Sequence, residues 1–402
     1  MPHVVQTEAL IAEGVLTPAQ GQIIARRSRQ VMVSLVINSV LCVGIIAAAI
    51  GFVFWLADAL AVAITGGLFL AIGTVVLLKA SDLYRMFGTA AALIGAGMLT
   101  FGGMVDLVDK LGERDGGLAL IVLGILSILG TVFAFRRSPP HARFLSGSLT
   151  LMAASLHIAG VYIWGEAIEL TGLPLAVIHG YVAALIFGFG LLVDVRLVTA
   201  LAIVPFAQML ETGTFYWSGM YAFYSPESTL TILQMSLAMV VCIALAHMLT
   251  ERVRRHTHLF GIMAFIVANL SFLVGSLWGD VVGLSIWGPG TSYWRAEGTY
   301  EEYTAARDAF EATALTISEH VYSIVWAVLL VLAAVWSAHT NRRGIFNAAM
   351  TFGAIHAYTQ AFETFYDEPL AYVIGGLAAI PVAWGIWRLN DRFEAQTQTG
   401  GV

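Results

Sequence analysis

The chain has 402 residues, of which 58% are hydrophobic and only 11% are charged, and its formal net charge is -6. A soluble domain is about 25% charged, so this composition excludes an ordinary soluble fold and a basic nucleic-acid-binding surface. The two cysteines, Cys42 and Cys242, lie inside apolar runs and indicate neither a disulfide framework nor a metal site.

Residues 1–30 contain no long apolar run, and we expect them to form a small helical head in the cytoplasm rather than a cleaved signal peptide. Thr17 and Gln20 have the spacing of a capping box, and Pro18 suits the first position of a helix. Gly14 can end a preceding short helix.

Twelve apolar runs follow the head, each close to the about 20 residues that cross a bilayer as a helix. The runs do not alternate between polar and apolar residues, so they predict helices rather than barrel strands. Their limits are 31–56, 59–78, 86–105, 117–135, 144–164, 174–193, 197–217, 229–249, 259–279, 316–338, 345–362 and 370–387. The predicted fold class is therefore an all-α membrane protein.

The distribution of basic residues predicts how these helices are oriented. If the N-terminus is cytoplasmic and the chain alternates, 16 of the 20 basic residues lie inside, as the positive-inside rule requires. Only Lys110, Arg114, Arg295 and Arg307 lie outside. Both termini are then cytoplasmic. Because two adjacent missed spans would leave this distribution unchanged, ten to fourteen spans remain open.

A long insertion at residues 280–315 interrupts the series of short loops on the predicted outer face. Gly288-Pro289-Gly290 is typical of a turn. Thr299 and Glu302 have capping-box spacing, which predicts a helix from about residue 300.

Two of the apolar runs resemble one another, which predicts an internal repeat. Small residues four positions apart, Gly180 and Ala184, recur as Gly375 and Ala379. Such residues allow close contact between membrane helices. We therefore expect two parallel halves of six helices each, at residues 31–193 and 194–402. Parallel repeats of this kind are common in transporters.

Ionisable groups inside membrane spans are costly and indicate function. His356, Gln360 and Glu363 are spaced four and then three residues apart, so they share one helix face. The predicted substrate or proton site comprises His157, His179, Glu319, His320, His356, Gln360 and Glu363. Its predicted outer rim comprises Glu166, Gln208 and Glu211.

On the predicted topology these groups lie in the outer half of the bilayer, which predicts one recess open to the outside. The alternative for any single histidine or glutamine is a hydrogen bond to a neighbouring helix. No catalytic residue is predicted. His256-Thr257-His258 falls in a predicted inner loop beside two arginines, so no metal ligand is predicted either.

The first 150 residues resemble a family of bacterial polytopic inner-membrane proteins that is known only as a domain of unknown function. The matching residues are Leu10, Gly14, Val15, Leu16, Thr17, Gln20, Phe54, Trp55 and the glycine-rich stretch 95–103. The family pattern has asparagine where this chain has Phe54. The resemblance implies location in the inner membrane and no particular activity.

The expected function is that of a secondary transporter or permease, with an unidentified small molecule or ion as ligand and the lipid bilayer as its other partner. An intramembrane enzyme or ligand sensor at the outer face is an alternative, as is a non-catalytic scaffold. Phosphate-binding and zinc-protease motifs are absent, so no cofactor is expected. The segment 79–85 is similar to a loop of major facilitator transporters, although it lacks the loop glycine and the chain lacks their long central loop.

Overall fold

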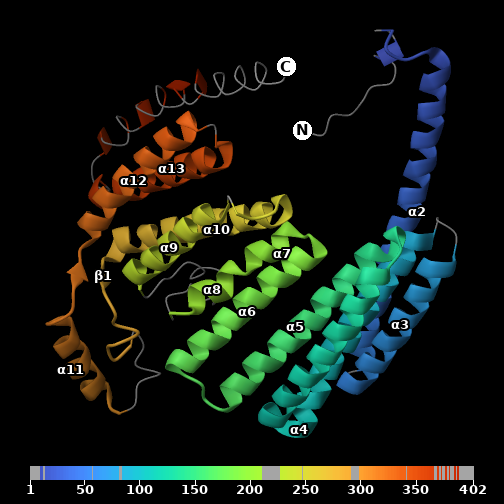
Figure 1. The fold of residues 1–402 in the computed structure, drawn as a ribbon, viewed down its shortest axis with the longest axis horizontal. Helices are drawn as coiled ribbons and strands as arrows, with labels where there is room; N and C mark the ends of the chain where they lie inside the picture. The colour runs from blue at the N-terminus through green and yellow to red at the C-terminus, as the bar shows by residue number, and fades with distance from the viewer. Residues whose placement is uncertain are drawn as a thin grey trace. The chain divides into compact units, whose positions relative to one another are not determined.

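The computed structural model describes the chain as an almost entirely helical protein (Figure 1). The described residues are 10–11, 14–56, 58–80, 84–210, 227–246, 248–290, 298–340, 342–365, 369–370, 373, 376–377, 380, 384–385 and 387–388. They group into two compact units, Met1–Leu170 and Thr171–Val402, and each unit is considered by itself below.

The first unit contains four long helices and one short turn of 3-10 helix. They are α2 (Pro18–Leu56), α3 (Ala59–Lys79), α4 (Arg85–Arg137), η2 (Pro140–Ala142) and α5 (Arg143–Ala167). The predicted capping box at the start of α2 is confirmed, because the Gln20 N–H donates to Thr17 Oγ1 and the Thr17 N–H donates to Gln20 Oε1. Gly14 has a φ of 73°, as a glycine that ends a helix requires.

Helix α4 is a hairpin rather than one straight helix. Gly112 has φ 78° and ψ 165°, a conformation that interrupts the helix and that glycine adopts without steric cost. A Cβ on Gly116 would lie 2.9 Å from the Cα of Val108, so the chain has turned back on itself there. The two arms, residues 85–111 and 113–137, contain the predicted spans 86–105 and 117–135.

Glycines hold α3 against the first arm of α4. A Cβ on Gly73 would lie 2.4 Å from the backbone nitrogen of Ala92, and one on Gly95 would lie 2.3 Å from that of Leu70. Neither position has room for a side chain. Because lipid provides no hydrophobic drive for helices to associate, this close backbone contact supplies the packing that holds the pair together.

The second unit contains the remaining elements. They are α6 (Gly172–Val193), α7 (Arg196–Leu201), α8 (Ile203–Gln208), α9 (Ser228–Ala246), α10 (Glu251–Trp278), β1 (Asp280–Val281), α11 (Tyr300–Glu311), β2 (Thr316–Ile317), α12 (Glu319–His339) and α13 (Arg343–Phe365). One apolar core of this unit joins α10, α12 and α13 around Trp326, Phe272 and Phe352.

The predicted span 197–217 begins as two short helices, α7 and α8. Pro205 has no N–H to donate to the carbonyl of Leu201, and its ring opposes that carbonyl, so α7 ends at Leu201. Residues 211–226, the remainder of that span and the loop after it, lie outside the described part of the chain.

Residues 280–290 and 298–317, within and just after the predicted insertion, form a folded segment between α10 and α12. Strands β1 and β2 pair in antiparallel fashion, with Asp280 opposite Ile317. The predicted capping box starts α11, because the Glu302 N–H donates to Thr299 Oγ1 and the Thr299 N–H donates to Glu302 Oε2. The β1–β2 pair thus joins the end of α10 to the start of α12.

Seven helices among the described residues are long and apolar enough to cross a membrane: α3, α4, α5 with η2, α6, α9, α10 and α12. Their outward side chains are large and apolar, and Leu68, Phe101 and Leu237 are each about 60% exposed or more. A surface of this kind suits lipid rather than water. The chain is an all-α protein compatible with the membrane, and the twelve spans and two six-helix halves remain predictions.

Candidate functional site

Two buried carboxylates, Glu227 and Asp280, lie where α10 ends and where α9 and α12 begin. We call this pair the clasp, because each residue holds the segment next to the other. Glu227 directly precedes α9 and is fully buried. Its Oε2 accepts from the N–H of Gly283 at 2.7 Å. Its Oε1 accepts from the N–H and the hydroxyl of Ser285, at 2.6 and 2.9 Å. Glu227 thus holds the loop that follows β1.

Asp280 makes the reciprocal connection, because it follows α10 and holds the start of α9. Its Oδ2 accepts from the Thr229 N–H at 2.8 Å and from the Thr229 hydroxyl at 2.5 Å. The hydroxyl of Tyr322, from α12, donates to the same oxygen at 3.2 Å. Asp280 therefore satisfies a backbone donor in the first turn of α9, as an N-cap residue does.

The clasp carries negative charge in a dry environment. Glu227 is fully buried and Asp280 is 8% exposed. Burial raises the pKa of Glu227, the hydrogen bonds from Ser285 and Gly283 oppose that shift, and the nearby charge of Asp280 adds to it. Among the described residues, neither carboxylate forms an ion pair with a basic side chain. Such a pair of acids favours uptake of a proton or another cation.

The clasp forms a first layer of polar groups, and a second layer lies further along α10 and α12, away from the helix ends that the clasp joins. The indole N–H of Trp326 donates to Asn269 Oδ1 at 2.8 Å, which links α12 to α10. Trp326 lies four residues after Tyr322, on the same face of α12. Phe272 packs against both Tyr322 and Trp326, so an apolar contact joins the two layers. We use the name polar column for the two layers taken together, which comprise Glu227, Thr229, Asp280, Ser285, Tyr322, Asn269, Trp326 and His356.

His356 brings α13 into this column. Its ring meets Trp326 edge-on, with centroids 4.8 Å apart. The Nδ1 atom of His356 is enclosed and has no hydrogen-bond partner among the described residues. A buried nitrogen without a partner is costly and marks a place where a water or a ligand group would fit. Gln360, one turn further along α13, is partly buried.

The other predicted site residues occupy several places. His157 lies in the first unit, where it is buried and its Nδ1 is 3.1 Å from the carbonyl oxygen of Ile121. Glu166 is exposed near the end of α5. His179 in α6 and Gln208 at the end of α8 are partly buried.

Glu319 and His320 begin α12, and the His320 side chain is 84% exposed at 3.8 Å from Glu319. Glu211 lies outside the described residues, as does the side chain of Glu363. Of the seven residues predicted to share a recess, the described contacts place His356 in the polar column. That the seven share one recess stays a prediction.

A third polar cluster joins α6, α7 and α10. His256 is fully buried, with Nδ1 2.6 Å from the Thr199 hydroxyl and Nε2 3.0 Å from Asp194 Oδ1. The hydrogen bond from His256 lowers the pKa of Asp194, and the charges of Arg252 and Arg255 act in the same direction. Although the three residues resemble a hydrolase triad, Thr199 is fully buried and cannot meet a substrate. The cluster fixes the α6–α7 turn against α10.

Glu227 and Asp280 were not among the residues predicted from the sequence. Each lies beside an apolar run, one just before 229–249 and the other just after 259–279. That position is typical of a residue at the water boundary. Their position beside spans without a basic residue nearby was a signal, but Asp58, Glu166 and Glu169 share it, so it does not single out this pair.

No family model matches the chain, and neither a curated protein nor a solved structure is detectably similar to it.

Proposed function

We propose that this chain is a multi-pass secondary transporter or permease of a bacterial inner membrane, and that the polar column is its site for a small polar solute or ion. The observation that carries the proposal is the column itself. Polar and ionisable groups inside apolar helices are expensive, and in membrane proteins they mark ligand and proton pathways. The resemblance of residues 1–150 to bacterial polytopic proteins supports the location.

The clasp supplies a means of coupling. A cation or proton that reaches Asp280 and Glu227 from the outside would neutralise charge that burial disfavours. Protonation also turns one oxygen of Glu227 from an acceptor into a donor, so its hydrogen bonds with Gly283 and Ser285 must rearrange. Ligand arrival would thereby move the loop after β1 and open a path to the deeper layer at Trp326.

The deeper layer has the chemistry of a binding site. Trp326 is 1% exposed and its ring stacks on Phe272, so the group left for a ligand is His356 Nδ1, which has no partner among the described residues and can accept or donate one hydrogen bond according to its tautomer. This atom suits a small solute that carries a hydrogen-bonding group. The exposed Glu319 and His320 at the start of α12 would lie at the entrance on the predicted topology.

The test is electrical recording from proteoliposomes on a solid support. The probes are steps in proton and sodium concentration and a panel of amino acids, sugars and organic amines. We expect at least one probe to give a transient current with the wild-type protein. Asp280→Asn should abolish that current while the protein remains folded, because all three hydrogen bonds use Oδ2 and an amide oxygen can accept them.

Asp308→Asn is the matched control, since Asp308 is an exposed acid on α11. It should leave the current unchanged. A wild-type protein that gives no current with any probe would contradict transport and favour a scaffold. A current that survives Asp280→Asn would exclude the clasp from the path.

A further inference from the structure

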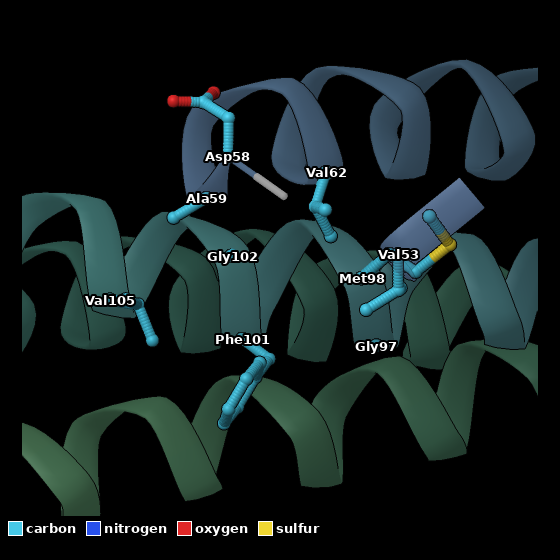
Figure 2. Close-up of a pocket in the computed structure, with 9 residues that line it drawn as sticks. All are labelled: Val53, Asp58, Ala59, Val62, Gly97, Met98, Phe101, Gly102 and Val105. Carbon is cyan, nitrogen blue, oxygen red and sulfur yellow. The ribbon is translucent and has the colours of Figure 1, made fainter. Parts of the chain in front are cut away.

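An apolar depression of about 370 Å³ opens on the first unit where α2 ends and α3 begins (Figure 2). It is lined by Val53 of α2, by Asp58, Ala59 and Val62 at the start of α3, and by Gly97, Met98, Phe101, Gly102 and Val105 of α4. We propose that this depression binds one acyl chain of a phospholipid whose headgroup carries a primary ammonium, and that Asp58 binds the ammonium.

Small residues of α4 create the depression. A Cβ on Gly97 would meet no atom within 4 Å, so the missing side chain leaves open space there. Gly102 instead allows α4 to approach α3, because its Cβ would lie 2.7 Å from the carbonyl oxygen of Ala59. Buried Val62 and Met98 form the floor, and Phe101, 64% exposed, forms a wall.

The dimensions suit the upper part of an acyl chain. Gly97 and Val105 are eight residues apart on α4, which is about 12 Å at 1.5 Å per residue. Asp58 is the N-cap residue of the membrane helix α3, so its carboxylate lies at headgroup level while the depression extends toward the hydrocarbon. A volume of about 370 Å³ also falls within the about 300–1,000 Å³ of small-molecule sites.

Charge determines which lipid is preferred. An acyl chain gains little by leaving other acyl chains for an apolar depression, so selectivity must come from the headgroup. Asp58 lines the depression at the start of α3, and in Figure 2 its carboxylate points away from Phe101 and Val105. Its Oδ1 accepts from the Ala61 N–H at 2.7 Å, and Oδ2, which has no hydrogen bond within the described part of the chain, can meet an ammonium. The nearby acid Asp106 is already paired with Lys110 at 2.8 Å.

The experiment is native mass spectrometry of the full chain in detergent, with phosphatidylethanolamine and phosphatidylglycerol added in competition. We expect phosphatidylethanolamine to bind about 2- to 5-fold more tightly, the ratio that an exposed ion pair provides. Asp58→Asn should remove this preference and keep α3 capped, because an amide oxygen can still accept from Ala61.

Gly97→Leu should fill the depression and remove the bound lipid. Gly103→Leu is the matched control, because Gly103 lies on the same helix, also faces open space and does not line the depression. Equal binding of the two lipids by the wild type would overturn the proposal. A preference that survives Asp58→Asn would overturn it too, as would lipid binding unchanged by Gly97→Leu.

Discussion

The two carboxylates of the clasp use their oxygens differently. Both oxygens of Glu227 accept hydrogen bonds, one from Gly283 and one from Ser285. Asp280 accepts all of its bonds on Oδ2. A carboxylate only accepts, whereas an amide accepts on one atom and donates on the other. Similar substitutions at these two residues therefore have different consequences.

Glu227→Gln is expected to destabilise the protein by about 1–3 kcal/mol, because its amide nitrogen would face a backbone N–H and leave buried donors unsatisfied. Asp280→Asn should cost less, since an oxygen can remain at the Oδ2 position. Thermal unfolding in detergent compares the two variants. Equal destabilisation would mean that the hydrogen-bond pattern of Glu227 does not govern its role.

The raised pKa of Glu227 predicts how stability depends on pH. Burial raises this pKa above its ordinary value of 4.5, so the folded state holds the proton more tightly than the unfolded state. The contribution of Glu227 to stability is then full below 4.5 and is lost as the pH rises through the folded-state pKa. The melting temperature of the wild type minus that of Glu227→Gln should therefore fall as the pH rises from about 4 to 8. A difference that grows with pH would contradict the raised pKa.

At the scale of helices, glycines spaced seven residues apart join α3 to α4 and α4 to α5. Gly66 and Gly73 of α3 meet residues of α4, and Gly88, Gly95 and Gly102 return the contact. The second arm repeats the pattern with Gly117 and Gly124 against α5, where Gly124 meets His157. Seven residues are close to two helical turns, so each series stays on one face.

Gly95→Leu should separate α3 from α4 and destabilise the first unit toward the upper end of the about 1–3 kcal/mol that overpacking costs. Its Cβ would lie 2.3 Å from a backbone nitrogen, and the backbone has no rotamer with which to yield. Gly103→Leu, on the same helix but facing open space, is the control for the change in composition. Thermal unfolding should give a lower melting temperature for Gly95→Leu than for Gly103→Leu. Equal melting temperatures would contradict close contact between α3 and α4 at Gly95.

Local signals in the sequence predicted most of the helices. Apolar length located them, and the capping boxes at Thr17 and Thr299 located two helix starts. The clasp was missed because it depends on tertiary structure. Glu227 and Asp280 are 53 positions apart, and no periodic pattern relates them. The seven-residue glycine spacing was readable in the sequence, but the contacts it makes required the fold.

At the scale of the whole molecule, the distribution of basic residues predicts two cytoplasmic ends. An alkaline phosphatase fused to the C-terminus should be inactive, because that enzyme requires the oxidising side of the membrane. A green fluorescent protein at the same place should fluoresce. The same pair of reporters inserted at the α4 turn near Gly112 should give the opposite result. An active phosphatase at the C-terminus would require an odd number of spans.

The α4 hairpin has a consequence for the order in which the first unit assembles. Its first arm packs on α3, which precedes it in the chain, and its second arm packs on α5, which follows it. Each contact is therefore made between elements that are neighbours in sequence, and loop closure costs little entropy. As the chain emerges from the ribosome, each of these contacts can form as soon as the second of its two helices has been made. The first unit can thus be completed during synthesis, before α6 has been made.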